Sequence, residues 1–467
     1  MIRYATVNGF KCRMDTRFLS FEEEEATGTI ISTVEDIVTG LQYKVRSKYL
    51  FGADGARSVI VKKLGLELEG RAGENLAIDV LVKADLSHLV EHRKGNLHWL
   101  IQPNVEHPDW GWLGVARMVK PWHEWIFSLF PRLGYDPKTA TRPSDGEYLQ
   151  RVKEFIGDDT PVELIRVSKW YINEIVAKTY SKGKVFCLGD AVHRHPPMNG
   201  LGSNTCIQDS FNLAWKIAAV MKGQASPALL DSYTAERQPV GRGIIKRAND
   251  SFRNHSAIWA ALGIMSPDVE ERKANLAELL TASTEAGTNR RRKFRDGIEY
   301  SAHEFHALGI EMNQHYVSDA VYVADEATPF EFAGKAAEDS VLYHTPSTYP
   351  GCRVPHACLN TAKPVKPIST IDVAGHGRWT LFTGIGGQGW KNAATNVEND
   401  MGVEIRAVSI GFRQDWEDVY FTWEKVRGVQ ENGCVLVRPD RFVAWRADRG
   451  GEEEHRLAKV MRRILAK

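Results

Sequence analysis

Two carboxylates, each next to glycine, are the residues best placed by type and spacing to bind a ligand. Asp54 lies in the run FGADG and Asp190 in the run FCLGDA, and both runs follow a β-rich or apolar segment. A carboxylate at the carboxyl edge of a parallel strand can accept hydrogen bonds from sugar or ribitol hydroxyls, and neighbouring glycines let a phosphate or ring approach the backbone. An Asp-Gly pair is also a common turn, so each motif alone favours a structural role.

A glycine-rich loop follows the second carboxylate and leads into a helix. The loop residues are Gly200, Leu201, Gly202, Ser203 and Asn204. The pattern after them predicts a helix from about Ser203 to Lys222, with Ser203 or Asn204 as its N-cap. Backbone N–H groups at such a helix start attract a phosphate, or stabilise a ring atom that gains negative charge.

The predicted helix is apolar around much of its circumference, so we expect it to be central in the fold. One face carries Ile207, Phe211, Ala214, Ala218 and Met221, and Leu213, Ile217 and Val220 widen it.

Three other motifs point to weaker or absent sites. Residues 384–389, GIGGQG, match the dinucleotide signature, but a helix of only about ten residues is expected before a loop-like ENDMG, so a tight structural turn is favoured. His193 and His195 lack a third ligand nearby, so no metal site is expected. The sequence has no G-x-S-x-G, H-E-x-x-H or Walker loop, which excludes the corresponding hydrolases and NTPases.

Composition bounds the class of protein. The chain has 467 residues and a formal net charge of +1, which predicts two or three domains and argues against a nucleic-acid binder. Six cysteines without a C-x-x-C predict neither a zinc site nor a disulfide framework and favour a reducing compartment. No signal peptide and no run of about 18 apolar residues is found, so we expect no membrane span and a cytoplasmic location.

Strands and helices that alternate along the chain predict an α/β, or mixed α+β, fold. A strand ending at Phe51, a glycine turn and a short helix from Arg57 to Leu64 have the order of a nucleotide-binding unit. Two further strands are predicted, Asn96 to Gln102 and Trp112 to Val119. Arg117 lies on the apolar face of the second, where an arginine either snorkels or meets an anion in a pocket. The chain from about 257 to 332 is predicted to be mostly helical.

At these motifs a family resemblance appears. FGADGARSVIVKKLGL and VFCLGDAVHRHPPMNGLGSNTCIQDSFNLAWKIA resemble the DG and GD motifs of class A flavoprotein aromatic hydroxylases. GVARMVKPW and HRHPPMNGLGSNT are similar to the phenol 2-monooxygenase and 2,4-dichlorophenol 6-monooxygenase branch. PGCRVPHACL, ISTID and VLVRPDRFVAWR resemble its thioredoxin-like C-terminal domain. The resemblance implies FAD as cofactor, NADPH or NADH as co-substrate, and O2 that reaches a phenolic or other aromatic ring through a flavin hydroperoxide.

The resemblance also implies roles for individual residues. Asp190, beside Gly189, should hold the ribitol and pyrophosphate part of FAD, and residues 200–204 should lie against the pyrimidine end of the flavin. Asp54, Gly55 and Arg57 should support FAD and a transient NADPH contact. Pro196 and Pro197 should form a wall beside the ring. Arg117 and Pro197 are the candidate catalytic residues, with Arg117 pointing into the substrate cavity.

The implied organisation is a truncated, Rossmann-like FAD-binding domain with an interleaved substrate sheet, through about residue 340. That sheet spans about 75–175 and a helical part about 225–335. Residues 341–467 form the thioredoxin-like domain, which lacks a C-x-x-C and should serve packing in a homodimer.

One departure from the family concerns the first residues. The chain opens at MIRYATVNGFKCRMD, which resembles a point inside the family's FAD domain, so the G-x-G-x-x-G unit and its phosphate cradle are not found. We therefore expect weak FAD retention. Two alternatives stay open: a catalytically impaired, truncated homologue that acts as a non-enzymatic binding protein, and a flavin reductase without oxygen insertion.

Overall fold

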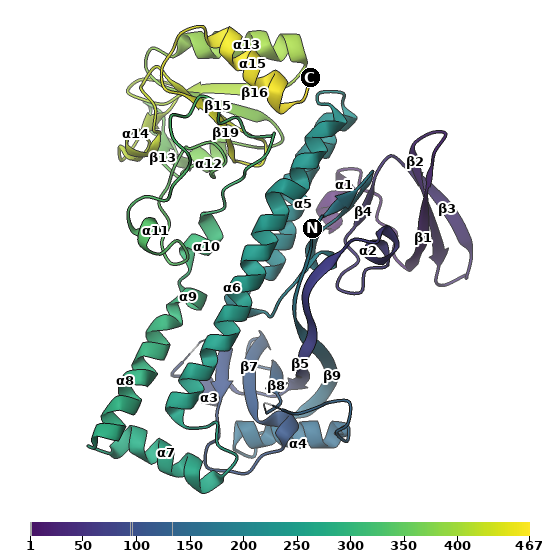
Figure 1. Cartoon of the computed structure of the whole chain (residues 1–467), viewed down its shortest axis with the longest axis vertical. Coiled ribbons are helices and arrows are strands. Elements are labelled where there is room, and N and C mark those ends of the chain that lie inside the picture. Colours follow the sequence, from purple (N-terminus) through teal and green to yellow (C-terminus); the bar gives the residue numbers. More distant parts are fainter. Residues whose placement is uncertain (1, 94, 96, 133) are drawn as a thin grey trace. The chain divides into compact units, whose positions relative to one another are not determined.

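The computed structural model describes residues 2–93, 95, 97–132 and 134–467. The chain divides into two compact units, each built from segments that are apart in the sequence (Figure 1). The first unit combines residues 1–69, 176–245 and 306–467, and the second combines residues 70–175 and 246–305. The C-terminal residues therefore belong to the same unit as both carboxylate motifs.

The first unit contains a pair of parallel strands, β4 (Leu50–Gly52) and β11 (Val185–Cys187), with the short antiparallel strand β10 (Ser181–Lys182) beside β11. The register pairs Gly52 with Cys187, and a Cβ added at Gly52 would lie 3.0 Å from the Cys187 Sγ. Glycine is therefore needed for the helix α2 (Val59–Leu64) and β11 to pack this closely.

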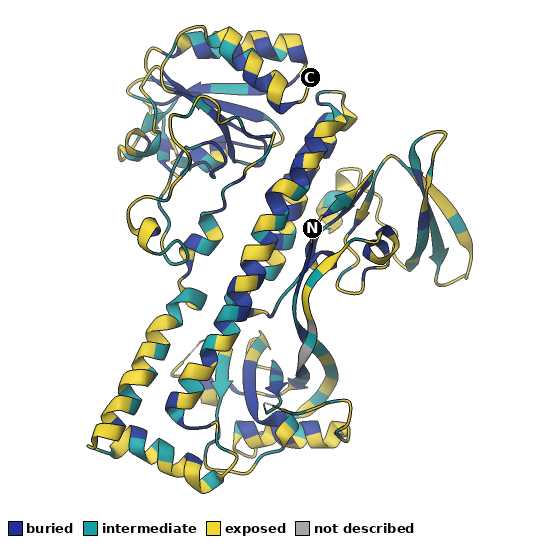
Figure 2. Cartoon of the chain, viewed as in Figure 1, coloured by how far each residue is buried: buried dark blue, intermediate teal, exposed yellow. Residues whose placement is uncertain are grey.

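An antiparallel sheet of β1 (Thr16–Glu24), β2 (Thr29–Asp36) and β3 (Gln42–Ser47) follows the short helix α1 (Ile2–Val7). Apolar and charged residues alternate in β3, whereas Ile30, Ile31 and Ser32 of β2 are three consecutive buried residues. Ile30 and Phe21 are buried, whereas β3 is mostly exposed (Figure 2).

Two long helices follow the second carboxylate, α5 (Gly202–Met221) and α6 (Ser232–Leu262). A 3₁₀ turn, Pro227–Asp231, links them, and Pro239 lies inside α6. The predicted N-cap at Ser203 or Asn204 is wrong, because α5 begins at Gly202 and Leu201 occupies the N-cap position.

The burial pattern of α5 differs from its predicted pattern. The stripe expected in the core is exposed, with Ile207 at 57%, Phe211 at 47% and Met221 at 55% exposure. The buried face carries Leu213 and Ile217, as predicted, together with Trp215, Ala219 and four polar residues, namely Thr205, Asp209, Asn212 and Lys216. Periodicity places residues on one face of a helix but does not say which face the rest of the chain covers.

The C-terminal part of the first unit is built on a sheet with the order β16-β15-β18-β19. β15 is parallel to β16 and antiparallel to β18. The four strands are β15 (Trp379–Thr383), β16 (Ile405–Ser409), β18 (Cys434–Val437) and β19 (Val443–Ala447). The helices α13 (Gln388–Met401) and α15 (Glu453–Ile464) pack on one face of the sheet. The other face packs against α12 (Thr370–Val373), α14 (Thr422–Val426) and the strands β14 (Ile368–Ser369), β13 (Cys358–Asn360) and β17 (Glu417–Asp418).

Trp215 of α5 joins the core of this C-terminal sheet, with its ring 5.6 Å from the ring of Trp379. The GIGGQG motif forms the turn between β15 and α13, and a Cβ at Gly387 would overlap the Thr383 side chain. The expected short helix is wrong, since α13 continues through ENDM to Met401 and ends at Gly402 with φ 67°.

The second unit is a sheet with strands in the order β9-β5-β8-β7-β6. Its elements are β5 (Leu68–Lys83), β6 (Leu97–Leu100), β7 (Leu113–Lys120), β8 (Glu124–Phe130), β9 (Glu163–Ala177), α3 (Ser87–Val90), α4 (Asp145–Ile156), α7 (Val269–Thr281), α8 (Glu285–Tyr300) and α9 (Ala302–Phe305). Asn96, the first residue of a predicted strand, lies outside the described residues. The helix α4 covers one face, and the end of α6 packs on the other.

Helical structure ends earlier than the sequence predicts. After α10 (Leu308–Met312), residues 313–334 form no helix or strand, and the next helix is α11 (Lys335–Glu338). Across the described ranges, the helices are all too short or too polar to cross a bilayer.

Candidate functional site

The parallel strands β4 and β11 bring the two carboxylate motifs to one edge of the sheet. Both strands end there, and the Leu188 N–H donates to the Gly52 carbonyl at 3.1 Å just beyond their last pair. The turns that carry Asp54 and Asp190 therefore start side by side. Sequence reasoning predicted each turn as a candidate site, and parallel pairing is the reason that they meet.

Asp54 is exposed and stabilises the start of α2. Its Oδ2 accepts from the Val59 N–H at 2.9 Å and from the Ile60 N–H at 3.3 Å, while the Ser58 hydroxyl accepts from the Val61 N–H. Gly55, with φ 77°, allows the turn before the helix, and Arg57 is exposed. At least one carboxylate oxygen of Asp54 is thus used by the protein's own backbone.

Asp190 lies in a 3₁₀ turn, Gly189–Ala191, with its side chain exposed. Gly189 has φ 63°, and a Cβ added there would lie 2.9 Å from the Cys206 Sγ. Cys206, in the second turn of α5, has its Sγ 3.9 Å from the Asp190 Oδ1. Burial, and then the charge of Asp190, raise the pKa of Cys206 to about 11, so the group beside the carboxylate is a neutral thiol.

The loop before α5 has a backbone that only a few residue types tolerate. Asn199 and Gly200 both have φ 64°, and the Asn204 side-chain amide donates to the Gly200 carbonyl at 3.0 Å. Pro196 is buried and Pro197 is exposed. The first helical residues, Gly202 to Asn204, follow an N-cap leucine whose side chain has no hydrogen-bond acceptor.

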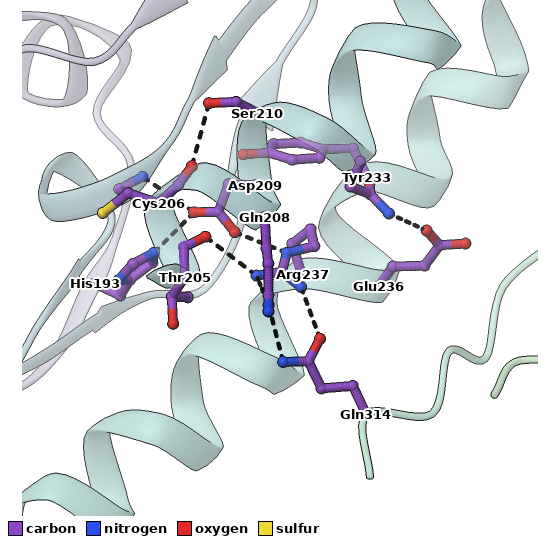
Figure 3. A network of polar contacts seen from close by, with 12 residues as sticks. His193, Thr205, Cys206, Gln208, Asp209, Ser210, Tyr233, Glu236, Arg237 and Gln314 are labelled. Atoms are coloured by element: carbon purple, nitrogen blue, oxygen red, sulfur yellow. Dashed lines mark hydrogen bonds and ion pairs between the residues drawn. The ribbon is translucent and has the colours of Figure 1, made fainter. Parts of the chain in front are cut away.

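A buried carboxylate that sequence reasoning missed, Asp209 of α5, ties the Asp190 turn to α5 and α6. The Asp209 Oδ2 accepts from the Gly189 N–H at 3.1 Å and from the His193 Nε2 at 2.8 Å, and its Oδ1 accepts from the Arg237 Nε at 2.7 Å (Figure 3). All three side chains are almost completely buried. Burial by itself raises the pKa of Asp209, but His193 and Arg237 outweigh it and lower that pKa.

A second buried cluster of charged residues joins Lys216 of α5 to Glu236 of α6 and to Arg438 and Asp440 near the C-terminal sheet. Glu236 accepts from the Lys216 Nζ at 2.7 Å and from the Arg438 Nη2 at 2.8 Å, and Arg438 also pairs with Asp440. These groups are fully or almost fully buried, so the cluster joins α5 and α6 to the C-terminal sheet. The sequence did carry a signal for both clusters, namely polar residues repeated along the buried face of α5.

Arg117 belongs to the second unit. It is exposed on β7, on the same face as Leu113 and Val115, and opposite Ile126 of β8 and Leu97 of β6. The other candidate residues all lie in the first unit.

The first-unit residues fit the ribitol end of FAD and the adjoining ring. An exposed carboxylate suits sugar-alcohol hydroxyls, and the start of α5 presents backbone N–H groups that favour negative charge. A Cβ at Gly200 would meet no atom within 4 Å, so a ligand can approach its backbone. Cys206, two residues after Asn204 on α5, links the start of this helix to Asp190 through its Sγ.

Comparisons with known proteins agree with this chemistry. Residues 1–248 match the FAD binding domain family, and residues 347–467 match the C-terminal family of aromatic-ring hydroxylases. The whole chain is 41% identical to 2,4-dichlorophenol 6-monooxygenase from Cupriavidus pinatubonensis, of which it covers 76%. Over 96% of its length it is 38% identical to phenol 2-monooxygenase from a Pseudomonas species, of which it covers 70%.

A solved structure is also similar. The flavin-dependent monooxygenase PieE, in complex with FAD and substrate, superposes with a TM-score of 0.87 at 38% identity. The match covers 97% of this chain and 75% of PieE.

Proposed function

Because the chain belongs to the FAD-dependent aromatic-ring hydroxylases, we propose that the Asp54 and Asp190 turns and the start of α5 hold FAD during hydroxylation of a phenol. The chain is an FAD-dependent aromatic monooxygenase that uses O2 with NADPH or NADH. The alternative of a non-enzymatic binding protein has no support among these relatives, which are named as monooxygenases.

The observation that carries the residue assignment is the pairing of β4 with β11, which places both carboxylate turns at one sheet edge beside α5. Asp190 accepts hydrogen bonds from the ribitol hydroxyls. Residues 200–204 stabilise negative charge on the ring through the helix N-terminus. Asp54 chiefly positions α2, and Arg57 supplies a nearby cation. When bound, FAD supplies the electron transfer and oxygen activation, while the protein orients the reactants and excludes water.

We infer a phenol or related aromatic as the substrate class, because the relatives named above act on phenol and 2,4-dichlorophenol. Arg117 and Pro197 are proposed to line the substrate site. The thioredoxin-like description of residues 341–467 and a homodimer are further proposals. A cytoplasmic location is supported by the cysteines, because all six are free.

The first test measures FAD affinity. Asp190→Asn removes the charge that accepts from ribitol hydroxyls, so the FAD Kd should rise about tenfold, as expected for loss of one charge-assisted hydrogen bond. Asp319→Asn is the matched control, since Asp319 lies in the same unit and is 83% exposed. Equal FAD Kd values for both variants would contradict the assigned role of Asp190.

The second test measures the product. The FAD-loaded chain is given NADPH, O2 and 2,4-dichlorophenol, and the aromatic products are separated and weighed. We expect a product with one added oxygen. Consumption of NADPH with hydrogen peroxide as the sole product, across a panel of phenols, would instead identify a flavin reductase.

A further inference from the structure

We propose that Asp79, in the sheet of the second unit, selects the aromatic substrate by accepting a hydrogen bond from its hydroxyl group. The proposal rests on the proposed function, because it assigns a recognition residue for that substrate. It concerns a residue outside the carboxylate motifs and the α5 loop.

Asp79 lies on the sheet face that α4 does not cover. Along β5, Ile78, Val80 and Val82 are buried in the core beneath α4. Side chains of a strand alternate between faces, so Asp79 shares the opposite face with Ala77, which packs in the core beside α6. A charged residue therefore stands where the strand pattern calls for an apolar one.

Neutral donors from both neighbouring strands hold the Asp79 carboxylate. The Ser128 hydroxyl of β8 donates to Oδ1 at 2.6 Å, and the Trp170 Nε1 of β9 donates to Oδ2 at 3.0 Å. Among the described residues Asp79 forms no ion pair. A half-buried carboxylate without a cation carries a desolvation cost, and each of its oxygens retains capacity for another donor.

On this face of the sheet, side chains become less buried from the row of Ala77 to the row beyond Asp79. Ala77 of β5 lies in one buried cluster with Phe130 and Leu113, which pair with each other across β8 and β7. The register then aligns Asp79 with Ser128 and Val115. The next row holds Leu81, Ile126 and Arg117, of which the first two are half-buried and the arginine is exposed.

This gradient gives an aromatic ring a place to pack. The ring can rest on the Leu81 and Ile126 side chains at the open edge, with its hydroxyl directed to the Asp79 carboxylate. The Trp170 and Ser128 donors fix the plane of that carboxylate, so the hydroxyl has one preferred direction. If Asp79 served only to hold β8 and β9 against β5, the same two hydrogen bonds would be present, but the chain would show no preference for a ligand with a hydroxyl group.

The two functions are separated by ligand preference rather than by activity alone. Binding of 2,4-dichlorophenol and of 2,4-dichloroanisole, its methyl ether, is measured by quenching of tryptophan fluorescence, with and without FAD and in the absence of NADPH. We expect the wild-type chain to prefer the phenol, because a site built to bond a hydroxyl discriminates against an analogue that lacks it.

Asp79→Asn should weaken phenol binding about tenfold while leaving ether binding and the FAD Kd unchanged. KM for the phenol should rise more than kcat falls. Asp159→Asn, on an exposed residue of the same unit, is the matched control. An unchanged phenol-to-ether ratio in Asp79→Asn, or equal weakening of both ligands, would overturn the proposal.

Ser128→Ala covers the case in which Asp79→Asn does not fold. It removes one of the two donors that fix the plane of the Asp79 carboxylate, so the phenol-to-ether binding ratio should fall while ether binding and the FAD Kd stay unchanged; an unchanged ratio would overturn the proposal. If the wild-type chain bound FAD and hydroxylated phenols without preferring them to ethers, the proposed function would stand and the inference would fail. If the chain preferred phenols to ethers but formed no hydroxylated product, the inference about Asp79 would stand and the proposed function would fail.

Discussion

Replacing Asp209 with asparagine tests the buried polar cluster beside the proposed cofactor site. The carboxylate uses both oxygens, one toward Gly189 and His193 and one toward Arg237. An amide has one oxygen, and a guanidinium can only donate, so that oxygen must stay with Arg237. The amide N–H groups then face the Gly189 N–H, which is also a donor and loses its partner.

The magnitude follows from the burial of each group. An unsatisfied buried N–H costs about 1–3 kcal/mol. Removing the charge that balances a fully buried arginine costs about 3–5 kcal/mol. Gln314 and Tyr316, which still accept hydrogen bonds from Arg237, reduce this cost. We therefore expect Asp209→Asn to lower the free energy of unfolding by about 3–5 kcal/mol. Asp319→Asn, exposed in the same unit, should change it by less than about 0.5 kcal/mol.

The assay is urea unfolding followed by circular dichroism, with FAD titration of the folded protein. FAD should bind Asp209→Asn more weakly, because the Gly189 turn that presents Asp190 has lost an anchor. The double variant with Arg237→Met should recover part of the stability, since no buried charge is then left unbalanced. A loss for Asp209→Asn no larger than that of Asp319→Asn would refute the reasoning.

Three further predictions concern other parts of the chain. Arg438→Met should lower the free energy of unfolding by about 3–5 kcal/mol, whereas the exposed Arg462→Met should cost less than about 0.5 kcal/mol in the same urea assay; equal effects would contradict a stabilising buried cluster. Burial, with nearby arginine charges, lowers the pKa of His107 from 6.5 to about 4. The unfolded chain therefore binds more protons between these values, and stability should fall as the pH drops through that window. His107→Asn should flatten this dependence in urea midpoints measured across the window, and an unchanged slope would count against it. Asp54→Ala should cost about 1 kcal/mol through loss of its bonds to the start of α2. It should also raise the FAD Kd, whereas Ser58→Ala should reduce stability alone; equal FAD affinities would limit Asp54 to its structural role.

The sequence identified the parts of the site that depend on neighbours along the chain. The Asp54 and Asp190 turns and the start of α5 are strand, turn and helix units of a few residues, so local patterns predict them. Asp209 was missed because its partners come from two segments distant in sequence, residues 189–193 and α6. Periodicity also predicted a buried apolar stripe on α5, yet the covered face is the one whose polar groups find partners on α6 and the C-terminal sheet.

The end of α13 shows a different limit. Asn and Asp in ENDMG suggested a loop, because these residues have low helix propensity. Val397 and Met401, four residues apart, are both buried against the C-terminal core, and Gly402 in the left-handed conformation ends the helix. Tertiary packing of one apolar face therefore outweighed local propensity.

The Glu236 and Arg438 pair also constrains how this protein can be recombined. The two residues are 202 positions apart, yet their charges balance only each other and their immediate neighbours in a buried cluster. A chimera that took its C-terminal residues from a relative without an arginine at this place would leave Lys216 as the cation that balances the buried Glu236, and Glu236 would lose its two hydrogen bonds from Arg438. Exchange of the C-terminal region would therefore succeed only when the facing residues of α5 and α6 are transferred with it.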